Sequence, residues 1–169
     1  MTESPLFIGR NLIEIEHCDS TNSYLAQMLK EKPLPEGTAI MATNKSNGRG
    51  QRGNSWESEP GANLLLSVLI QPEFLQARDH FKLNMLVSLA LYDLCHSYLG
   101  DMLKIKWPND ILYGRSKVAG ILIENNVLGP NIKNSIIGIG LNVNQLQFSY
   151  EGANSLANIL GEQLSVNKV

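Results

Sequence analysis

Apolar and polar positions follow two different periods along the chain, and each change of period marks a predicted element. Residues 12–18 (LIEIEHC) alternate apolar and polar side chains, which predicts a half-buried strand. Asp19 or Ser20 can cap a following helix that ends near Lys30, because both residue types accept hydrogen bonds from free backbone N–H groups. Residues 38–43 then predict a second, buried strand.

The longest helical pattern covers residues 77–99, where Phe81, Met85 and Leu89 recur at helical spacing. Gly100 is a natural end for this helix. The remaining strand-like segments are residues 63–70, 104–107, 117–124 and 132–143, while residues 111–115 (ILYGR) indicate a turn into a hairpin. Residues 155–164 are expected to form a weak helix. The order of strand, helix, strands, helix and several strands predicts an α+β fold, with a mixed, largely antiparallel central sheet flanked by helices.

Composition narrows the class of protein. The 169 residues are 43% hydrophobic and 18% charged, as in an ordinary globular domain, and the net charge of −2 gives no basic footprint for nucleic acid. No apolar run approaches the roughly 20 residues that span a bilayer, and no signal peptide is evident. Cys18 and Cys95 match neither a metal nor a redox pair, so we expect a cytoplasmic protein. The three histidines have no metal-ligand spacing.

Residues 44–60 (NKSNGRGQRGNSWESEP) cannot build a core and predict a long surface loop. Its GRGQRG stretch, residues 48–53, combines glycines that allow close backbone approach with arginines that pair with carboxylate or phosphate. The stretch lacks the ending of a phosphate-binding P-loop and the spacing of a dinucleotide fingerprint. By itself it indicates an anion site weakly, and a flexible basic loop is the simpler reading.

Two further segments carry candidate chemistry. KWPND (residues 106–110) would project Asn109 and Asp110 at a strand edge, and Lys117 begins an apolar strand where its ammonium group could meet a negative reacting group. A turn with solvated charges is the alternative. GIGLNVN (residues 138–144) places glycines at alternate strand positions, which indicates a bulge or close packing as readily as the wall of a ligand site.

Together and in this order, these motifs resemble the catalytic domain of the biotin–protein ligases. The resemblance runs from about Leu12 to Leu156. Its motifs are Ser20-Thr21-Asn22, GRGQRG with Trp56, Gly61-Ala62-Asn63-Leu64, KWPND, RSKVAGILIE (residues 115–124) and GIGLNVNQ (residues 138–145). KWPND followed by Lys-x-Ala-Gly-Ile-Leu is the most specific part.

The resemblance implies a fold like that of biotin and lipoyl ligases and class II synthetases, and an enzyme that joins biotin to a carrier lysine. ATP and Mg²⁺ would activate biotin as biotinyl-5′-AMP, and a lysine of a biotin carboxyl carrier protein would accept it. Biotin contacts carried over from the family are Ser20, Thr21, Asn22, Lys45, Arg49, Gly50, Gln51, Lys117, Gly120, Leu122, Gly138 and Gly140. ATP contacts are Arg49, Gln51, Arg52, Trp56, Asn63, Asn109, Asp110, Lys117 and Asn142. The catalytic residues would be Lys117, Arg49 and Asp110, with Asp110 also facing Mg²⁺.

The sequence departs from the family pattern at three positions. Lys45 stands where members often carry a glutamine that contacts the ureido end of biotin. Gln51 replaces an arginine that is common in the glycine–arginine loop, and Asn54 stands where a basic residue is frequent. With one cation fewer, we expect a weaker hold on the adenylate.

The ends of the chain set further expectations. Val169 follows soon after the last motif, so we expect a single catalytic domain over residues 1–169 without the family's SH3-like C-terminal domain. Only 19 residues precede Ser20, too few for a winged-helix DNA-binding domain, so we expect no transcriptional role. A homodimer through the open sheet edge is compatible with the sequence.

Two alternatives remain open. One is a lipoate or octanoate ligase or transferase, since those enzymes resemble the biotin ligases in structure and also acylate a carrier lysine. The other is a non-catalytic biotin-binding module, which Lys45 and Gln51 favour and which Arg49, Asp110 and Lys117 oppose.

Overall fold

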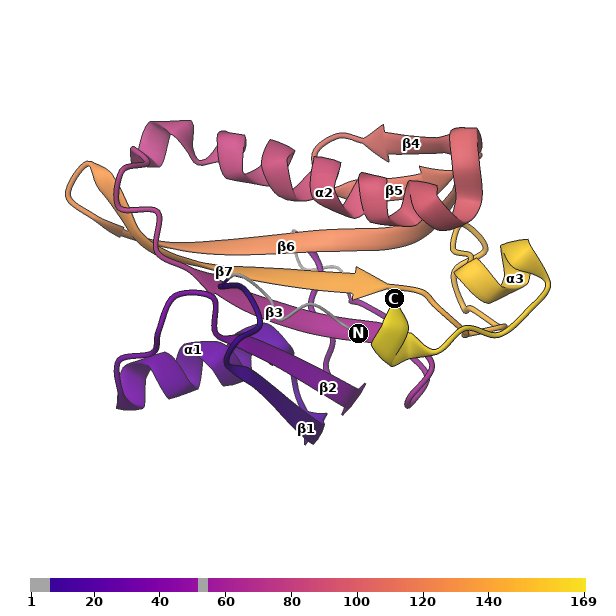
Figure 1. The fold of residues 1–169 in the computed structure, drawn as a ribbon, viewed down its shortest axis with the longest axis horizontal. Helices are drawn as coiled ribbons and strands as arrows, with labels where there is room; N and C mark the ends of the chain where they lie inside the picture. Colours follow the sequence, from indigo (N-terminus) through magenta and orange to yellow (C-terminus); the bar gives the residue numbers. More distant parts are fainter. Residues whose placement is uncertain (1–6, 52–54) are drawn as a thin grey trace.

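A computed structural model describes residues 7–51 and 55–169. The sheet of these residues has seven strands in the order β1-β2-β3-β7-β6-β5-β4 (Figure 1). The strands are β1 (Leu12–Cys18), β2 (Ala39–Lys45), β3 (Leu64–Ile70), β4 (Leu103–Lys106), β5 (Asp110–Tyr113), β6 (Ser116–Leu128) and β7 (Asn131–Leu141). β1 and β2 are parallel, joined by helix α1 (Thr21–Glu31), and all other neighbours are antiparallel. The predicted α+β fold with a mixed, largely antiparallel sheet is confirmed.

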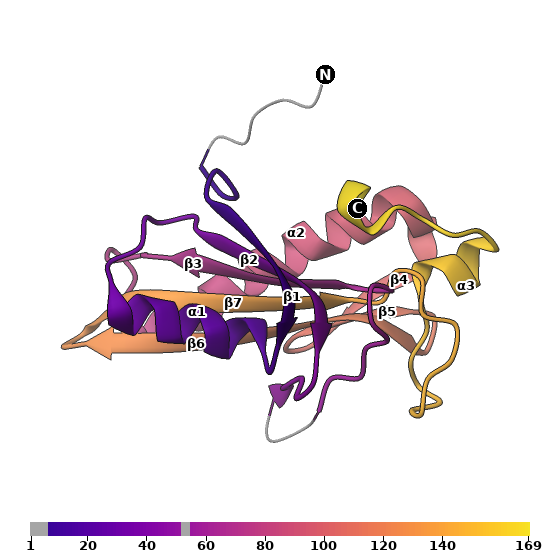
Figure 2. The same ribbon diagram turned by 90° about the horizontal axis from the view of Figure 1, so that it is seen from below.

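The two long helices cover opposite faces of the sheet, as the views in Figures 1 and 2 show. Helix α2 (Phe81–Leu99) packs on one face against a cluster that includes Ile121 and Ile137. Helix α1 packs on the other face against Ile136 and Leu69. Because successive residues of a strand point to opposite faces, the neighbours Ile136 and Ile137 of β7 belong to different halves of the core, Ile136 on the α1 face and Ile137 on the α2 face.

Several predicted boundaries shift for local reasons. The helical pattern of residues 77–99 is a short 3₁₀ turn (Ala77–Asp79) followed by α2, with His80 between them. β6 reaches past its predicted end, whereas β7 begins one residue earlier than predicted and ends two residues earlier. The two strands form a long hairpin that closes at Gly129, where φ is +60°. The tail helix is shorter than predicted, because Gly161 adopts a left-handed conformation and ends α3 (Leu156–Leu160).

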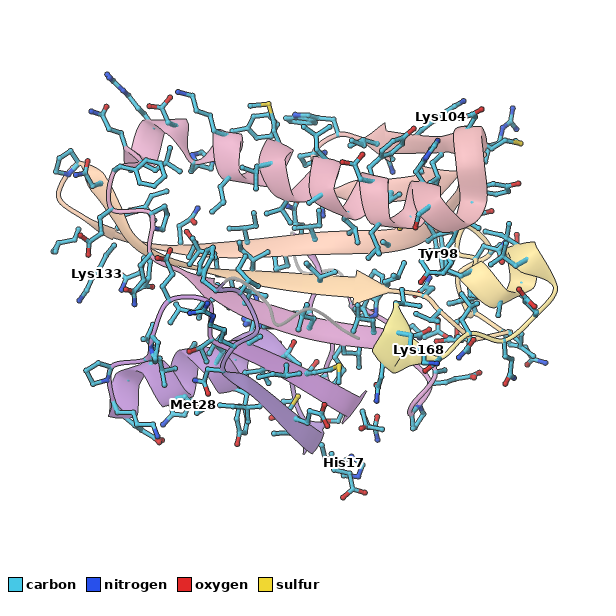
Figure 3. The ribbon with its side chains drawn as sticks, viewed as in Figure 1. His17, Met28, Tyr98, Lys104, Lys133 and Lys168 are labelled. Carbon is cyan, nitrogen blue, oxygen red and sulfur yellow. The ribbon has the colours of Figure 1, made fainter. Side chains whose placement is uncertain are left out.

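Charged side chains lie at the ends and edges of the molecule. Lys133, beside the β6–β7 turn, and Lys104 on the edge strand β4 are exposed and point outward (Figure 3). Lys168 lies in the last turn (Val166–Lys168), where Val166 and Val169 pack against the α2 side of the core. None of the helices in the described part of the chain is long and apolar enough to cross a membrane.

Candidate active site

A hollow of about 350 Å³ opens on the sheet face that carries α1. Its floor consists of Gly120 and Leu122 of β6 opposite Gly140 and Gly138 of β7, in register. Because these positions alternate along the strands, they share one face, and three of the four lack a side chain. We call this hollow the glycine pocket; it exists because the sheet has no side chains to fill it there.

The N-terminus of α1 forms one wall of the glycine pocket. Thr21 and Asn22 lie in its first turn and are buried. Ser67 of β3, fully buried, lies with its Oγ 2.7 Å from Thr21 Oγ1 and 2.6 Å from Asn22 Oδ1. Asn22 Nδ2 donates to Glu124 Oε2 at 2.7 Å. These contacts fix the Asn22 carboxamide directly above Gly138, where an added Cβ would clash with Asn22 Oδ1.

Three ion pairs, formed by two carboxylates, hold cations at the rim. The guanidinium Nη2 of Arg49 lies 3.1 Å from Glu124 Oε2. Lys117 Nζ lies 2.7 Å from Asp110 Oδ1, and Lys106 Nζ lies 3.8 Å from Asp110 Oδ2. Such groups can stabilise the anionic oxygens of a carboxylate or phosphate.

Trp56 lies within the glycine pocket. An added Cβ on Gly140 would meet its indole at 2.5 Å, and one on Gly120 would meet it at 2.9 Å, so the ring lies directly against the glycine floor. The Nζ atoms of Lys45 and Lys117 lie 5.7 and 5.2 Å from the ring centroid. Desolvation lowers the pKa of Lys45 to about 8.

The glycine pocket brings together most of the site residues that the sequence predicts. All twelve expected biotin contacts line it, as do Trp56, Asn109 and Asp110 from the expected ATP set. Arg52 and Asn54 lie outside the described residues. Asn109 is held at the pocket by its Nδ2, which donates to the carbonyl of Ile121 at 2.8 Å.

Asn63 and Asn142 do not line the glycine pocket. Asn63 is buried, donating to Gln145 Oε1 at 2.7 Å and accepting from the Val143 N–H at 3.0 Å. Asn142 is also buried and donates to the carbonyl of Asn154 at 2.9 Å, while its Oδ1 has no partner among the described residues. Both side chains therefore anchor the segment that follows β7.

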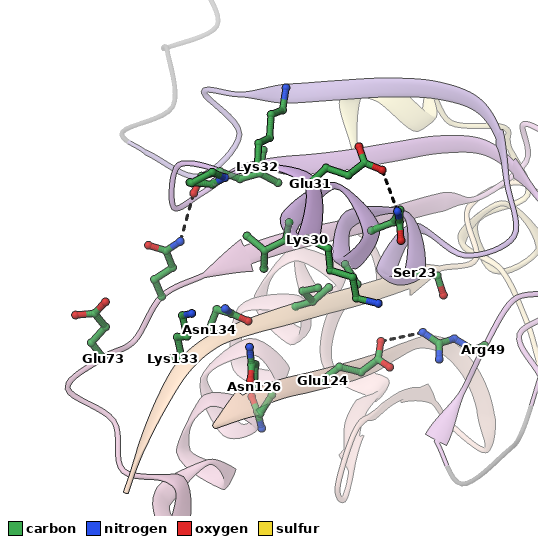
Figure 4. A pocket seen from close by; sticks show the side chains of 18 residues that line it. Ser23, Lys30, Glu31, Lys32, Arg49, Glu73, Glu124, Asn126, Lys133 and Asn134 are labelled. Carbon is green, nitrogen blue, oxygen red and sulfur yellow. Dashed lines mark hydrogen bonds and ion pairs between the residues drawn. The ribbon is translucent and has the colours of Figure 1, made fainter. Parts of the chain in front are cut away.

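Sequence reasoning missed Ser67 and Glu124, which position the expected residues. Each carries a weak signal, since a lone serine interrupts the apolar strand LLLSVLI and a glutamate ends the apolar run of VAGILIE. Glu124 also separates the glycine pocket from a larger groove of about 970 Å³ between α1 and the β6–β7 hairpin. Figure 4 shows this groove, with the Arg49–Glu124 pair at its inner end and Lys30, Lys133 and Asn134 along it.

Asp110 does not form a resident metal site by itself. Its carboxylate already faces two ammonium groups, and the described residues contain no cluster of three His, Cys, Asp or Glu side chains that could hold a metal ion. Magnesium is commonly held by one or two carboxylates together with substrate phosphates. The expected Mg²⁺ contact of Asp110 stays a prediction, with the ion arriving on the nucleotide.

A mixed sheet with a glycine-floored hollow and cations at its rim is an arrangement that can hold a small anionic ligand. The sequence matches the biotin/lipoate A/B protein ligase family over residues 14–142. The chain therefore belongs to the biotin/lipoate A/B protein ligase family.

Known relatives agree with this assignment. The bifunctional ligase/repressor BirA of Bacillus spizizenii is 32% identical over 93% of this chain and 49% of the relative. The biotin–[acetyl-CoA-carboxylase] ligase of Paracoccus denitrificans is 38% identical over 74% of this chain and 51% of the relative. The biotin protein ligase of Aquifex aeolicus, solved with biotin and ATP, superposes with a TM-score of 0.77 at 31% identity, over 94% of this chain and 65% of that one. The chain thus spans about half the length of these curated relatives.

Proposed function

We propose that this protein is a biotin–protein ligase, which activates biotin with ATP and transfers it to a lysine of a biotin carboxyl carrier protein. One observation carries the proposal. Arg49, Lys117 and the Ser20-Thr21-Asn22 turn, which lie far apart in sequence, line a single pocket over a floor of glycines. A solved relative from Leishmania major, 26% identical with a TM-score of 0.73, was crystallised with biotinyl-5′-AMP.

The geometry suits the first half-reaction. The biotin carboxylate attacks the α-phosphorus of ATP, forming a mixed anhydride and expelling pyrophosphate. The two anions repel each other on approach, and negative charge builds on the phosphoryl oxygens. Lys117 and Arg49, held in place by Asp110 and Glu124, would face this charge and lower the barrier.

In the second half-reaction, the amine of the acceptor lysine attacks the activated carbonyl, an amide forms, AMP leaves and the amine loses a proton. No enzyme nucleophile is needed, so the pocket only has to orient the adenylate and exclude water. The groove of Figure 4 opens on Arg49 and would give an acceptor side chain a path from solvent.

Pyrophosphate exchange tests this proposal. The protein is incubated with ATP, Mg²⁺ and labelled pyrophosphate, with biotin, lipoate or octanoate as the acid. Exchange with biotin supports the biotin ligase. Exchange with lipoate or octanoate alone would assign the chain to the lipoyl branch of the family, and binding of biotin without any exchange would leave a non-catalytic module.

A further inference from the structure

Helix α2 carries an apolar stripe on its outer side. Its inner side packs on the sheet, whereas Met85, Leu86 and Leu89 on the outer side are 46%, 64% and 56% exposed. Ala90 is exposed beside them, and the four residues form one patch because residues three and four apart are neighbours on a helix. We call this patch the α2 stripe. Clustered exposed apolar side chains mark contact surfaces, whereas scattered ones need no explanation.

Opposite charges flank the α2 stripe. Lys82 lies one turn before the stripe and Asp93 one turn after it, and both side chains are exposed on the same side of the helix. Lys82 Nζ lies 3.0 Å from Asp79 Oδ1. Within residues 7–51 and 55–169, by contrast, Asp93 forms no ion pair. The stripe therefore has an ammonium at one end and an unpaired carboxylate at the other.

The α2 stripe is complementary to itself when two copies of the helix pack antiparallel. A two-fold axis that passes halfway between Leu86 and Leu89 pairs each of these leucines with the other one in the second copy. The same axis places Met85 opposite Ala90, so that a long side chain meets a short one. Identical subunits most often associate through such a two-fold contact, in which one surface patch meets itself.

The flanking charges obey the same symmetry. Lys82 and Asp93 are equidistant from the axis, so the ammonium of each copy faces the carboxylate of the other at both ends of the contact. Asp93 thereby gains the cation that it lacks within its own chain. We infer that the outer side of α2 is a dimerisation face, on which α2 of a second copy of this chain packs antiparallel.

This face is separate from the proposed reaction and from the sheet edges. The glycine pocket and the groove of Figure 4 lie on the α1 side of the sheet, whereas α2 covers the opposite side, so both copies keep their pockets open (Figures 1 and 2). The open edges of the sheet are β1 and β4. One helix face per copy buries less than the roughly 1,200 Å² of a standard interface, so we expect a weak dimer with a Kd in the micromolar range.

Sedimentation velocity of the whole chain at about 1–300 µM measures this association. Leu86→Glu places a charge at the centre of the contact and should raise the Kd about 100-fold or more. Lys82→Glu and Asp93→Lys each set like charges opposite one another and should raise the Kd about tenfold. Lys104→Glu makes the same charge change on the exposed edge strand β4 and should leave the Kd unchanged.

A mixture of the two charge variants gives the sharpest test. When Lys82→Glu meets Asp93→Lys, the introduced glutamate faces the introduced lysine at one end, and the native Asp93 faces the native Lys82 at the other. The equimolar mixture should therefore dimerise within about threefold of the unsubstituted Kd, although neither variant does so alone. Thermal unfolding of each variant verifies that it is folded.

Three results would overturn the inference. The unsubstituted protein would stay monomeric at about 300 µM, or the mixture would dimerise no more tightly than the single variants. A dimer that Leu86→Glu leaves intact would place the contact elsewhere, such as at the open sheet edge. Because the readout is mass and not activity, failure of the proposed function would leave this test unaffected.

Discussion

The Nζ atom of Lys117 lies 2.7 Å from Oδ1 of Asp110, and this ion pair sets the position of the ammonium at the rim of the glycine pocket. We expect Lys117→Met to lower kcat for biotin-dependent pyrophosphate exchange about 100-fold to 1,000-fold, because one preorganised cation is lost where charge develops. Lys117→Arg, which keeps the charge, is the control. A decrease of less than tenfold for Lys117→Met would contradict the role given to Lys117.

Ser67 holds the first turn of α1 from a buried position. Ser67→Ala removes the contacts to Thr21 Oγ1 and Asn22 Oδ1, leaving buried polar atoms without this partner. We expect a loss of about 1–3 kcal/mol in the free energy of unfolding, measured in urea, and a higher KM for biotin. Ser97→Ala, at an exposed serine of α2, should change stability by less than about 0.5 kcal/mol. Equal effects of the two substitutions would refute the special role of Ser67.

The indole of Trp56 lies on the floor that the biotin rings are proposed to take. We expect biotin to displace it, and this displacement can be followed by fluorescence in a Trp107→Phe background, which leaves Trp56 as the one tryptophan of the chain. Saturating biotin should shift the emission to longer wavelength as the ring becomes exposed. Gly140→Ala should cause a similar shift without biotin, because its Cβ would lie 2.5 Å from the ring. Unchanged emission on biotin binding would show that the ring stays on the floor.

Gln51 lines the glycine pocket, at the position where the resemblance to the biotin–protein ligases implies an arginine. We expect Gln51→Arg to lengthen the lifetime of the enzyme-bound adenylate about tenfold, because a cation adds a charge-assisted contact to the phosphate. The lifetime can be measured by chasing labelled adenylate with unlabelled biotin and ATP. If the unsubstituted protein already releases the adenylate as slowly as arginine-bearing relatives, the prediction is wrong.

Cys95, on the buried face of α2, makes the stability of the protein depend on pH in the alkaline range. Burial raises its pKa from 9.0 to about 12, so the folded state keeps the proton after the unfolded chain has lost it. The stability that this thiol contributes is fully present below pH 9 and is lost as the pH rises toward 12. At pH 10.5 this thiol alone should contribute about 2 kcal/mol less to the free energy of unfolding than at pH 8.

Cys95→Ala isolates this effect, since it removes the thiol and leaves the other titrating groups. Lys45 acts in the opposite direction, because a lowered lysine pKa adds stability between pH 8 and 10.5. Over pH 9–10.5 the two effects oppose each other in the unsubstituted protein, so the unfolding free energy of Cys95→Ala, measured in urea, should rise more steeply with pH than that of the unsubstituted protein. Parallel curves for the two proteins would rule out Cys95 as the cause.

The fold could be predicted largely from the sequence, because in its main elements the period of the hydrophobic positions agrees with the observed burial of the side chains. Residues 12–18 alternate and form the half-exposed edge strand β1, while the apolar runs of β3 and β7 lie inside the sheet. The split at His80 and the early end at Gly161 were not predicted, because both depend on backbone geometry that the hydrophobic pattern does not encode.

The candidate site was predicted from the family motifs in the sequence more than from the physical properties of its individual residues. Arg49 and Lys117 have no local feature that distinguishes them from solvated cations. Asp110 reaches Lys117 only when β5 pairs with β6, and Glu124 of β6 reaches Arg49, in the segment after β2, only in the folded protein. Asn63 and Asn142 belong to the family motifs, yet in this structure their side chains form hydrogen bonds with the backbone of the segment after β7. Motif spacing does not tell whether an asparagine faces a ligand or a neighbouring strand.

The contact of Asn22 with Glu124 joins residues 102 positions apart, and it lies at the wall of the glycine pocket. The pocket therefore cannot form on any short fragment; it is completed only when β6 has docked beside β7 and α1 has packed across them. A ligand bound there would contact α1, early in the chain, as well as β6 and β7, late in the chain. Because it would bind only the folded protein, by mass action it would slow the unfolding of the whole sheet. The concentration of substrate would thus govern how long the protein stays folded as well as the rate at which it turns over substrate.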